Sequence, residues 1–142
     1  MAKKIVVVED DQSILDLYVE ILTAEGYEVQ AASSGQEALD LLKSTDRLPC
    51  VMLTDFMMPN MNGTQLVELI RKEDMLISLP VVIISAEPKI HEKVGKLDYM
   101  KKPIELDAII AKVKEYCGLA NDKCLTIEER IKMAEKEPRI NI

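Results

Sequence analysis

The chain has 142 residues, of which 48% are hydrophobic and 30% charged, and its formal net charge is −7. This length is that of one ordinary domain with a single core. The acidic balance argues against a non-specific nucleic-acid binder or a protein of anionic membranes, since either needs a basic face.

Short β-branched runs alternate along the chain with longer stretches of helical period. Residues 5–8 are apolar throughout, which is typical of a strand covered on both faces. Apolar spacing from Ile14 to Glu25 then predicts a helix that ends at Gly26. Further strands are expected at 28–32, 50–55, 80–86 and near 97–103, and further helices from 34, at 63–72 and at 104–117. This alternation predicts a parallel sheet with helices on both faces.

The fourth crossover is unusually short. Only ten residues separate Ala86 from Leu97, close to the lower limit for a parallel crossover that includes its helix. We therefore expect a fourth helix of one or two turns, begun by Pro88 and ended by Gly95. The only histidine, His91, lies in this segment, where we expect it to be an exposed surface residue without a chemical role.

Residues 119–142 follow the last expected helix, and no strand pattern occurs in them. Thr126 and Glu129 have capping-box spacing, and apolar positions follow along one side, which predicts an added helix. We expect a domain at 1–118 and an extension at 119–142 that is too short to form a DNA-binding helix-turn-helix domain. The extension is interpreted either as a contact surface or as a solvated tail helix.

The cysteines and the N-terminus suggest where the protein works. Cys50, Cys117 and Cys124 are an odd number without CxxC spacing, so neither a disulfide framework nor a zinc site is indicated. Cys50 and Cys117 fall on core-facing positions and are expected to pack there. No apolar run has the length of a signal-peptide core or of a membrane span. We expect a cytoplasmic protein without a membrane segment.

Polar side chains stand where the expected strands end. They are Glu9, Asp10 and Asp11 after the first strand, Asp55 at the third, Ser85 at the fourth and Lys102 at the fifth. Ligands of an open parallel sheet bind outside the carboxyl ends of its strands, so these groups should converge. Adjacent carboxylates repel unless a cation offsets them, and oxygen ligands suit Mg²⁺. A further carboxylate can form an acyl phosphate, whose oxygens lysine and serine can hold.

Four segments together resemble the receiver domain of two-component response regulators, of the CheY-like superfamily. They are VVVEDD, MLTDFMMPNMNG, VVIISAE and LDYMKKP, in the order in which the family has them. The resemblance implies a flavodoxin-like five-stranded sheet of order 2-1-3-4-5. It also implies a phosphoryl group received from a histidine kinase or a histidine phosphotransfer protein, with a downstream protein target and no direct DNA binding.

The resemblance also assigns a phosphoacceptor and its metal ligands. Asp55 would accept the phosphoryl group, and Asp10 and Asp11 would form the acid pair that binds Mg²⁺. Asp55 itself and the backbone carbonyl of Met57 would complete the protein's ligands to the ion.

Further assignments concern transfer and switching. Lys102 would hold the phosphoryl group, and the hydroxyl of Ser85 would assist and then act as a switch together with Tyr99. The peptide bond between Lys102 and Pro103 is expected to be cis, as the family usually has it.

Two other functions remain open at this point. A phosphatase with an aspartyl-phosphate intermediate would need a second acid two residues after its nucleophile, where this chain has Met57. A degenerate receiver would keep the pocket and act as a phosphorylation-independent interaction module. On the leading hypothesis the protein is no enzyme beyond assisting its own phosphotransfer and dephosphorylation.

The surface around the fourth helix departs from the family pattern. Besides the short crossover, Gly95 and Lys96 stand where the family usually has Gly-Ala before the fifth strand. Receivers form dimers or dock onto targets through this region. We therefore expect this protein to dock onto a separate partner instead of dimerising there.

Overall fold

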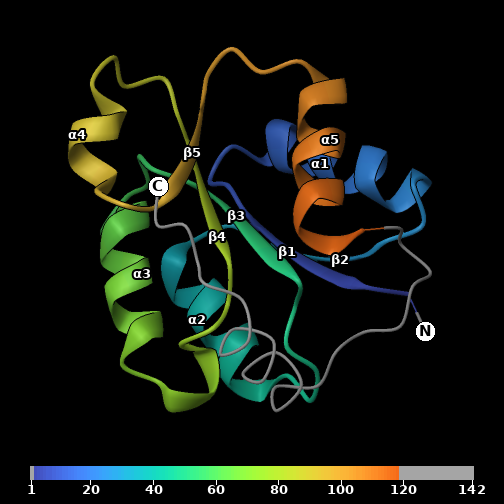
Figure 1. Cartoon of the computed structure of the whole chain (residues 1–142), viewed down its shortest axis with the longest axis horizontal. Coiled ribbons are helices and arrows are strands. Elements are labelled where there is room, and N and C mark those ends of the chain that lie inside the picture. The colour runs from blue at the N-terminus through green and yellow to red at the C-terminus, as the bar shows by residue number, and fades with distance from the viewer. Residues whose placement is uncertain (1, 119–142) are drawn as a thin grey trace.

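Five parallel strands form the central layer of the structure, a computed structural model that describes residues 2–118 (Figure 1). The order of the strands is β2-β1-β3-β4-β5, and every neighbouring pair is parallel. The strands are β1 (Lys4–Val8), β2 (Glu28–Ala32), β3 (Val51–Asp55), β4 (Val81–Ser85) and β5 (Asp98–Lys101). This arrangement confirms the flavodoxin-like fold expected from the sequence.

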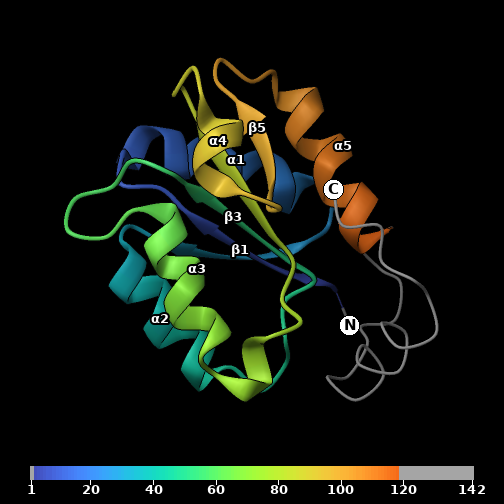
Figure 2. The ribbon, with the colours of Figure 1, turned by 60° about the vertical axis from the view of Figure 1, so that its left-hand side comes forward.

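Helices cover both faces of the sheet, as Figures 1 and 2 show. They are α1 (Gln12–Ala24), α2 (Gly35–Ser44), α3 (Gly63–Arg71), α4 (Ile90–Val94) and α5 (Leu106–Cys117), with a short 3₁₀ helix, η1 (Asp74–Leu76), after α3. One core lies between the sheet and α2, α3 and α4, and a second lies between the sheet and α1 and α5. β1, β3 and β4 are buried along their whole length because both cores press on them.

The fourth helix is as short as the sequence predicts. α4 has five residues, and it begins at Ile90, two positions later than the expected start at Pro88. Gly95 follows it with φ of 61°, a backbone conformation that favours glycine. The short crossover therefore leaves little more than one helical turn between β4 and β5.

Some expectations fall outside the part of the chain that is described. The helix predicted within residues 119–142 and the contacts of that extension lie beyond Gly118, so they remain predictions. Among the helices of residues 2–118, none has the length and hydropathy that a membrane crossing requires.

One expectation about the cysteines is corrected by the structure. Cys50, just before β3, and Cys117, the last residue of α5, form a disulfide with a Cα–Cα distance of 5.4 Å. Both side chains are buried, as their core-facing positions predicted, but they are paired and do not merely pack. The pairing was not visible in the sequence because 67 positions separate the two residues, and only the fold brings them together.

The first residue of α3 closes tightly onto the end of β3. The backbone N–H of Gly63 donates a hydrogen bond of 2.9 Å to the carbonyl of Phe56. A Cβ atom at Gly63 would lie 2.9 Å from the carbonyl oxygen of Asp55 and 3.3 Å from Cα of Phe56. Backbone atoms cannot move aside as a side-chain end can. Glycine at this position therefore lets α3 pack against the residue that carries the Asp55 carboxylate.

Replacing this glycine should loosen the packing. We expect Gly63→Ala to lower the free energy of unfolding by about 1–3 kcal/mol, the usual cost of overpacking a close contact. Urea denaturation measures the change. Gly35→Ala is the matched control, since Gly35 is also the first residue of a helix but its Cβ would meet the flexible Sδ end of Met61. Equal losses in the two variants would contradict the explanation.

Candidate functional site

Three carboxylates meet at the carboxyl ends of two neighbouring strands. Glu9 and Asp10 follow β1, and Asp55 is the last residue of β3. One oxygen from each side chain lies within 4.8 Å of the others. Glu9 and Asp55 are buried, whereas Asp10 is exposed. These three residues are called the carboxylate cluster below.

A lysine from the loop after β5 reaches into the carboxylate cluster. The Nζ atom of Lys102 lies 3.3 Å from Oδ1 of Asp55 and 3.5 Å from Oε2 of Glu9. Its backbone N–H donates a 2.8 Å hydrogen bond to the carbonyl of Ser85, and the following bond to Pro103 is cis, as expected. The convergence of Asp10, Asp55 and Lys102 at one edge of the sheet is therefore confirmed.

Burial dominates the electrostatics of the cluster. It raises the pKa of Glu9, and the negative charge of nearby Asp55 raises it further. Burial also raises the pKa of Asp55, although Lys102 opposes the shift. Burial alone would lower the pKa of Lys102, but its attraction to Asp55 and Glu9 outweighs that effect and raises it. The lysine therefore stays charged beside carboxylates whose ionised forms are costly.

The charges of the cluster leave room for a divalent cation. Three ionised carboxylates with one lysine carry a net charge of −2, which one divalent cation balances. Oxygens on opposite sides of a bound Mg²⁺ are about 4.2 Å apart, because each ligand lies about 2.1 Å from the ion. Adjacent ligand oxygens are about 3 Å apart, so the cluster, whose oxygens lie within 4.8 Å of one another, would have to close around the ion. The donor set and its charge thus fit Mg²⁺.

The carboxylate cluster does not include Asp11, which was expected to form the acid pair with Asp10. Its Oδ1 accepts hydrogen bonds from the backbone N–H groups of Ser13 at 3.0 Å and Ile14 at 3.2 Å. Asp11 is therefore the N-cap of α1, where it satisfies donors that have no partner within the helix. Glu9 takes the place expected for Asp11, and its Oε1 accepts the backbone N–H of Asp11 at 3.2 Å.

A sequence signal for this assignment existed. Asp11 immediately precedes the helical stretch that starts at Gln12, which is the usual place of an N-cap. Glu9 directly follows the apolar run of β1 and so stands where the strand leaves the core. Counting the acids from the end of the strand would have selected Glu9 and Asp10.

The remaining expected residues lie around the cluster. Ser85 is buried at the end of β4, and its Oγ accepts the backbone N–H of Glu87 at 2.9 Å. Tyr99 on β5 is half-buried and packs against the core beneath α2, α3 and α4. The side chain of Met57 is 64% exposed in the loop after β3. The switch role of Ser85 and Tyr99 and the metal role of the Met57 carbonyl remain predictions, and His91 is exposed, as expected.

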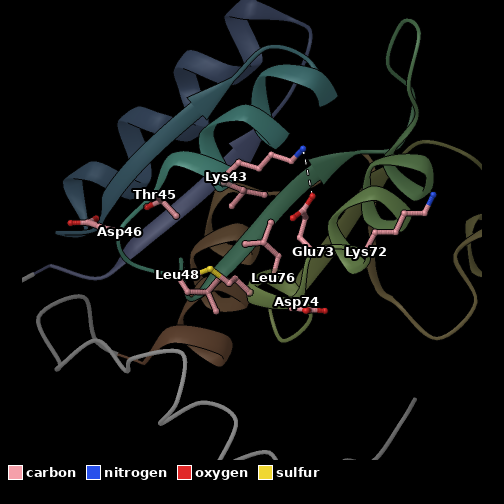
Figure 3. A pocket seen from close by; sticks show the side chains of 10 residues that line it. Lys43, Thr45, Asp46, Leu48, Lys72, Glu73, Asp74 and Leu76 are labelled. Atoms are coloured by element: carbon pink, nitrogen blue, oxygen red, sulfur yellow. Dashed lines mark ion pairs between the residues drawn. The ribbon is translucent and has the colours of Figure 1, made fainter.

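A separate pocket of about 500 Å³ lies at the opposite end of the strands from the carboxylate cluster. Figure 3 shows the side chains that line it. Its walls come from the end of α2, from residues 72–76, which follow α3 and include η1, and from the segment before β3. Leu42, Leu48 and Leu76 contribute apolar side chains. An ion pair of 3.5 Å between Lys43 and Glu73 crosses part of it. None of its lining residues belongs to the carboxylate cluster, so the pocket is not the candidate active site.

Comparison with known proteins agrees with the geometry. Residues 5–114 match the model of the response regulator receiver domain. The structure resembles the chemotaxis response regulator CheY4 of Vibrio cholerae with 25% identity and a TM-score of 0.74, over 82% of this chain and 99% of that one.

Other solved receivers are similar to the same degree. The receiver domain of the Francisella response regulator 1452 is 30% identical with a TM-score of 0.71, over 80% of this chain and 95% of that one. A CheY-like receiver domain protein from Methanospirillum hungatei JF-1 is 26% identical with a TM-score of 0.73, over 94% of this chain and 99% of that one. The matched residues include the whole carboxylate cluster and Lys102. The chain belongs to the response regulator receiver domain family.

Proposed function

We propose that this receiver is the phosphoacceptor of a two-component system or phosphorelay. Asp55 takes a phosphoryl group from the histidine of a sensor kinase or of a phosphotransfer protein. The observation that carries the proposal is the position of the Asp55 carboxylate, 3.3 Å from the ammonium group of Lys102 and within 4.8 Å of two further carboxylates. Such a site supplies a nucleophile together with groups that hold phosphoryl oxygens.

The residues divide the work of phosphoryl transfer. A carboxylate oxygen of Asp55 bonds to phosphorus while the phosphorus–nitrogen bond of the donor histidine breaks. The ammonium group of Lys102 offsets negative charge on the phosphoryl oxygens. Because the Oγ of Ser85 accepts a hydrogen bond from Glu87, its own proton is free to be donated to the phosphoryl group. That donation is the step through which we expect Ser85 and Tyr99 to act as a switch.

We assign Mg²⁺ to the carboxylate cluster, as receiver domains generally bind this ion. Glu9, Asp10 and Asp55 would hold it, together with the backbone carbonyl of Met57. When bound, the ion supplies positive charge for the incoming phosphoryl oxygens. Glu9 replaces Asp11 in this ligand set because Asp11 is occupied as a helix cap.

We also propose that signalling runs through a separate protein target in the cytoplasm, without direct DNA or membrane binding. Receiver domains work with histidine kinases and downstream proteins. In this chain α4 has only five residues, which leaves little surface there for a symmetric interface of about 800 Å² per partner.

Phosphorylation at Asp55 can be tested by mass spectrometry. Acetyl phosphate with Mg²⁺ should add one phosphoryl group to the wild type and none to Asp55→Asn. Asp11→Asn is the matched control, since asparagine caps helices about as well as aspartate, and it should be labelled like the wild type. A label that persists in Asp55→Asn would contradict the assignment. A wild type that never labels would favour the phosphorylation-independent interaction module.

The metal assignment predicts different results for two nearby acids. Glu9→Gln should weaken Mg²⁺ binding by on the order of tenfold or more, because a charged ligand is lost, whereas Asp11→Asn should keep it. Binding is measured as the stabilisation that Mg²⁺ gives against thermal unfolding. The opposite pattern, with Asp11→Asn losing the effect, would restore Asp11 as a ligand.

The same variant tests the electrostatics without metal. Because the pKa of Glu9 is raised in the folded protein, ionisation of this side chain lowers the free energy of unfolding. The loss develops as the pH rises from the ordinary pKa of 4.5 towards the raised pKa. We therefore expect Glu9→Gln to be as stable as the wild type at acidic pH and more stable at neutral pH when Mg²⁺ is removed. Urea denaturation at several pH values measures the difference. A neutral-pH loss of stability in Glu9→Gln would show that the Glu9–Lys102 contact outweighs burial and repulsion.

The proposal of a separate partner predicts that two copies of the protein do not associate through the α4 face. Light scattering with and without beryllofluoride, which mimics the phosphoryl group, should give the mass of one chain. Dimers that appear only with beryllofluoride and disappear on substitution of Tyr99 would show that this face is an interface between copies.

A further inference from the structure

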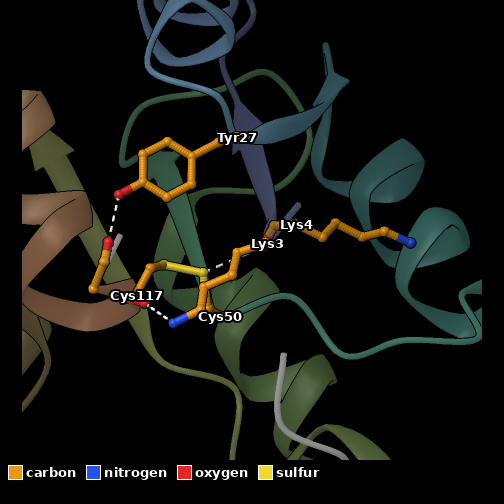
Figure 4. Close-up of a disulfide and its surroundings, with 6 residues drawn as sticks. Lys3, Lys4, Tyr27, Cys50 and Cys117 are labelled. Atoms are coloured by element: carbon orange, nitrogen blue, oxygen red, sulfur yellow. Dashed lines mark hydrogen bonds between the residues drawn. A yellow bond between two sulfur atoms is a disulfide. The ribbon is translucent and has the colours of Figure 1, made fainter. Parts of the chain in front are cut away.

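The Cys50–Cys117 disulfide joins the start of a central strand to the end of a surface helix. Cys50 lies just before the central strand β3, and Cys117 is the last residue of α5 (Figure 4). Both side chains are buried in the core beneath α1 and α5, with 6% and 3% of their surface exposed. The bond lies at the amino end of β3, so it is at the opposite end of that strand from Asp55.

The sheet holds Cys50 in place. Its backbone N–H donates a 2.9 Å hydrogen bond to the carbonyl of Lys4, and the next residue, Val51, pairs with Ile5 of β1. Val51 is fully buried between the two cores. Movement on the Cys50 side would therefore disturb the central sheet.

The end of α5 lies outside the sheet and is held by hydrogen bonds to the backbone of Cys117 and Gly118. The hydroxyl of Tyr27 donates to the carbonyl of Gly118 at 2.7 Å, and Nζ of Lys3 donates to the carbonyl of Cys117. The backbone N–H of Gly118 bonds to the carbonyl of Lys114, and both of these residues are exposed. Helix ends open more readily than central strands, so the last turn of α5, and not the Cys50 side, is the part that can open.

The surroundings also suit the reduced pair. An apolar core accommodates thiols well. The sulfur of Cys50 lies 3.3 Å from the carbonyl oxygen of Lys4, which can accept the proton of a thiol. Two thiols need more room than one disulfide, and the last turn of α5 can provide it.

We propose that Cys50 and Cys117 form a reversible redox site that fixes the last turn of α5 when oxidised and releases it when reduced. Disulfides in the cytosol are usually transient or redox-sensing, so this step rests on the cytoplasmic location in the proposed function. It does not depend on phosphorylation, because Asp55 lies at the other end of β3. The oxidation state of these two cysteines would thereby act as a second signal beside phosphorylation. It would act at the end of α5, just before residue 119.

Glutathione disulfide is a suitable oxidant by chemical class. The thiolate of Cys117, exposed when the last turn opens, attacks one glutathione sulfur and expels a glutathione thiolate. The thiolate of Cys50 then attacks the Cys117 sulfur and expels the second glutathione thiolate. The protein loses two electrons and two protons, and glutathione disulfide becomes two molecules of glutathione. Reduction is the reverse sequence.

A redox titration of the full chain tests the proposal. The protein is equilibrated in glutathione buffers of increasing oxidised fraction, quenched with acid, alkylated and mapped by mass spectrometry, with Cys124→Ser as a second background that keeps only this pair. We expect Cys50 and Cys117 to convert together in one two-electron transition. Amide hydrogen exchange at 114–118 should be on the order of tenfold faster in the reduced state, as when one or two hydrogen bonds weaken. A pair that stays oxidised or stays reduced in every buffer, or equal exchange in both states, would overturn the proposal.

A second experiment tests whether the end of α5 controls access. Tyr27→Phe removes the hydroxyl that donates to Gly118 and should speed reduction by dithiothreitol about fivefold, the effect of one hydrogen bond. Tyr18→Phe is the matched control, because Tyr18 is buried under the same face of the sheet but lies on α1. Reduction of Tyr27→Phe at the wild-type rate would show that the last turn of α5 does not gate the disulfide. Phosphorylation of Asp55 is measured in the same samples, so failure of either proposal can be recognised separately.

Discussion

The contact of Lys102 with Asp55 and Glu9 is the interaction on which the site depends. Burial makes ionised carboxylates costly at the ends of β1 and β3, and one lysine offsets only part of their charge. The cluster is therefore held in a state that gains from added positive charge. This is the physical basis of the proposal that the same side chains bind a cation and accept a phosphoryl group.

The parallel sheet determines where these polar side chains meet. All its strands point the same way, so the polar residues that follow them gather at one edge, while both faces remain apolar. Gly63 lets α3 start directly against the end of β3, which fixes the backbone beside Asp55. The disulfide and a separate pocket lie at the opposite end of the strands and share no residues with the carboxylate cluster.

The adjacent acids Glu9, Asp10 and Asp11 show how far residue patterns reach. Their place after a buried strand correctly predicted an acidic site, but the choice among three successive carboxylates depends on where the strand ends and the helix begins. Asp11 becomes a cap because α1 starts at Gln12, and this leaves Glu9 and Asp10 for the cluster. A shift of one residue in such a turn changes which acid caps the helix and which acids face the site.

The sequence by itself determined the alternation of strands and helices, the order of the sheet through its family resemblance, the short α4 and the gathering of Asp10, Asp55 and Lys102. These features follow from local periodicity and from residues at strand ends, which a sequence displays directly. Only the tertiary structure decided that Glu9 contacts Lys102 and that Cys50 pairs with Cys117. Both depend on distances across the folded chain, and no local pattern encodes a contact between residues that are 67 positions apart.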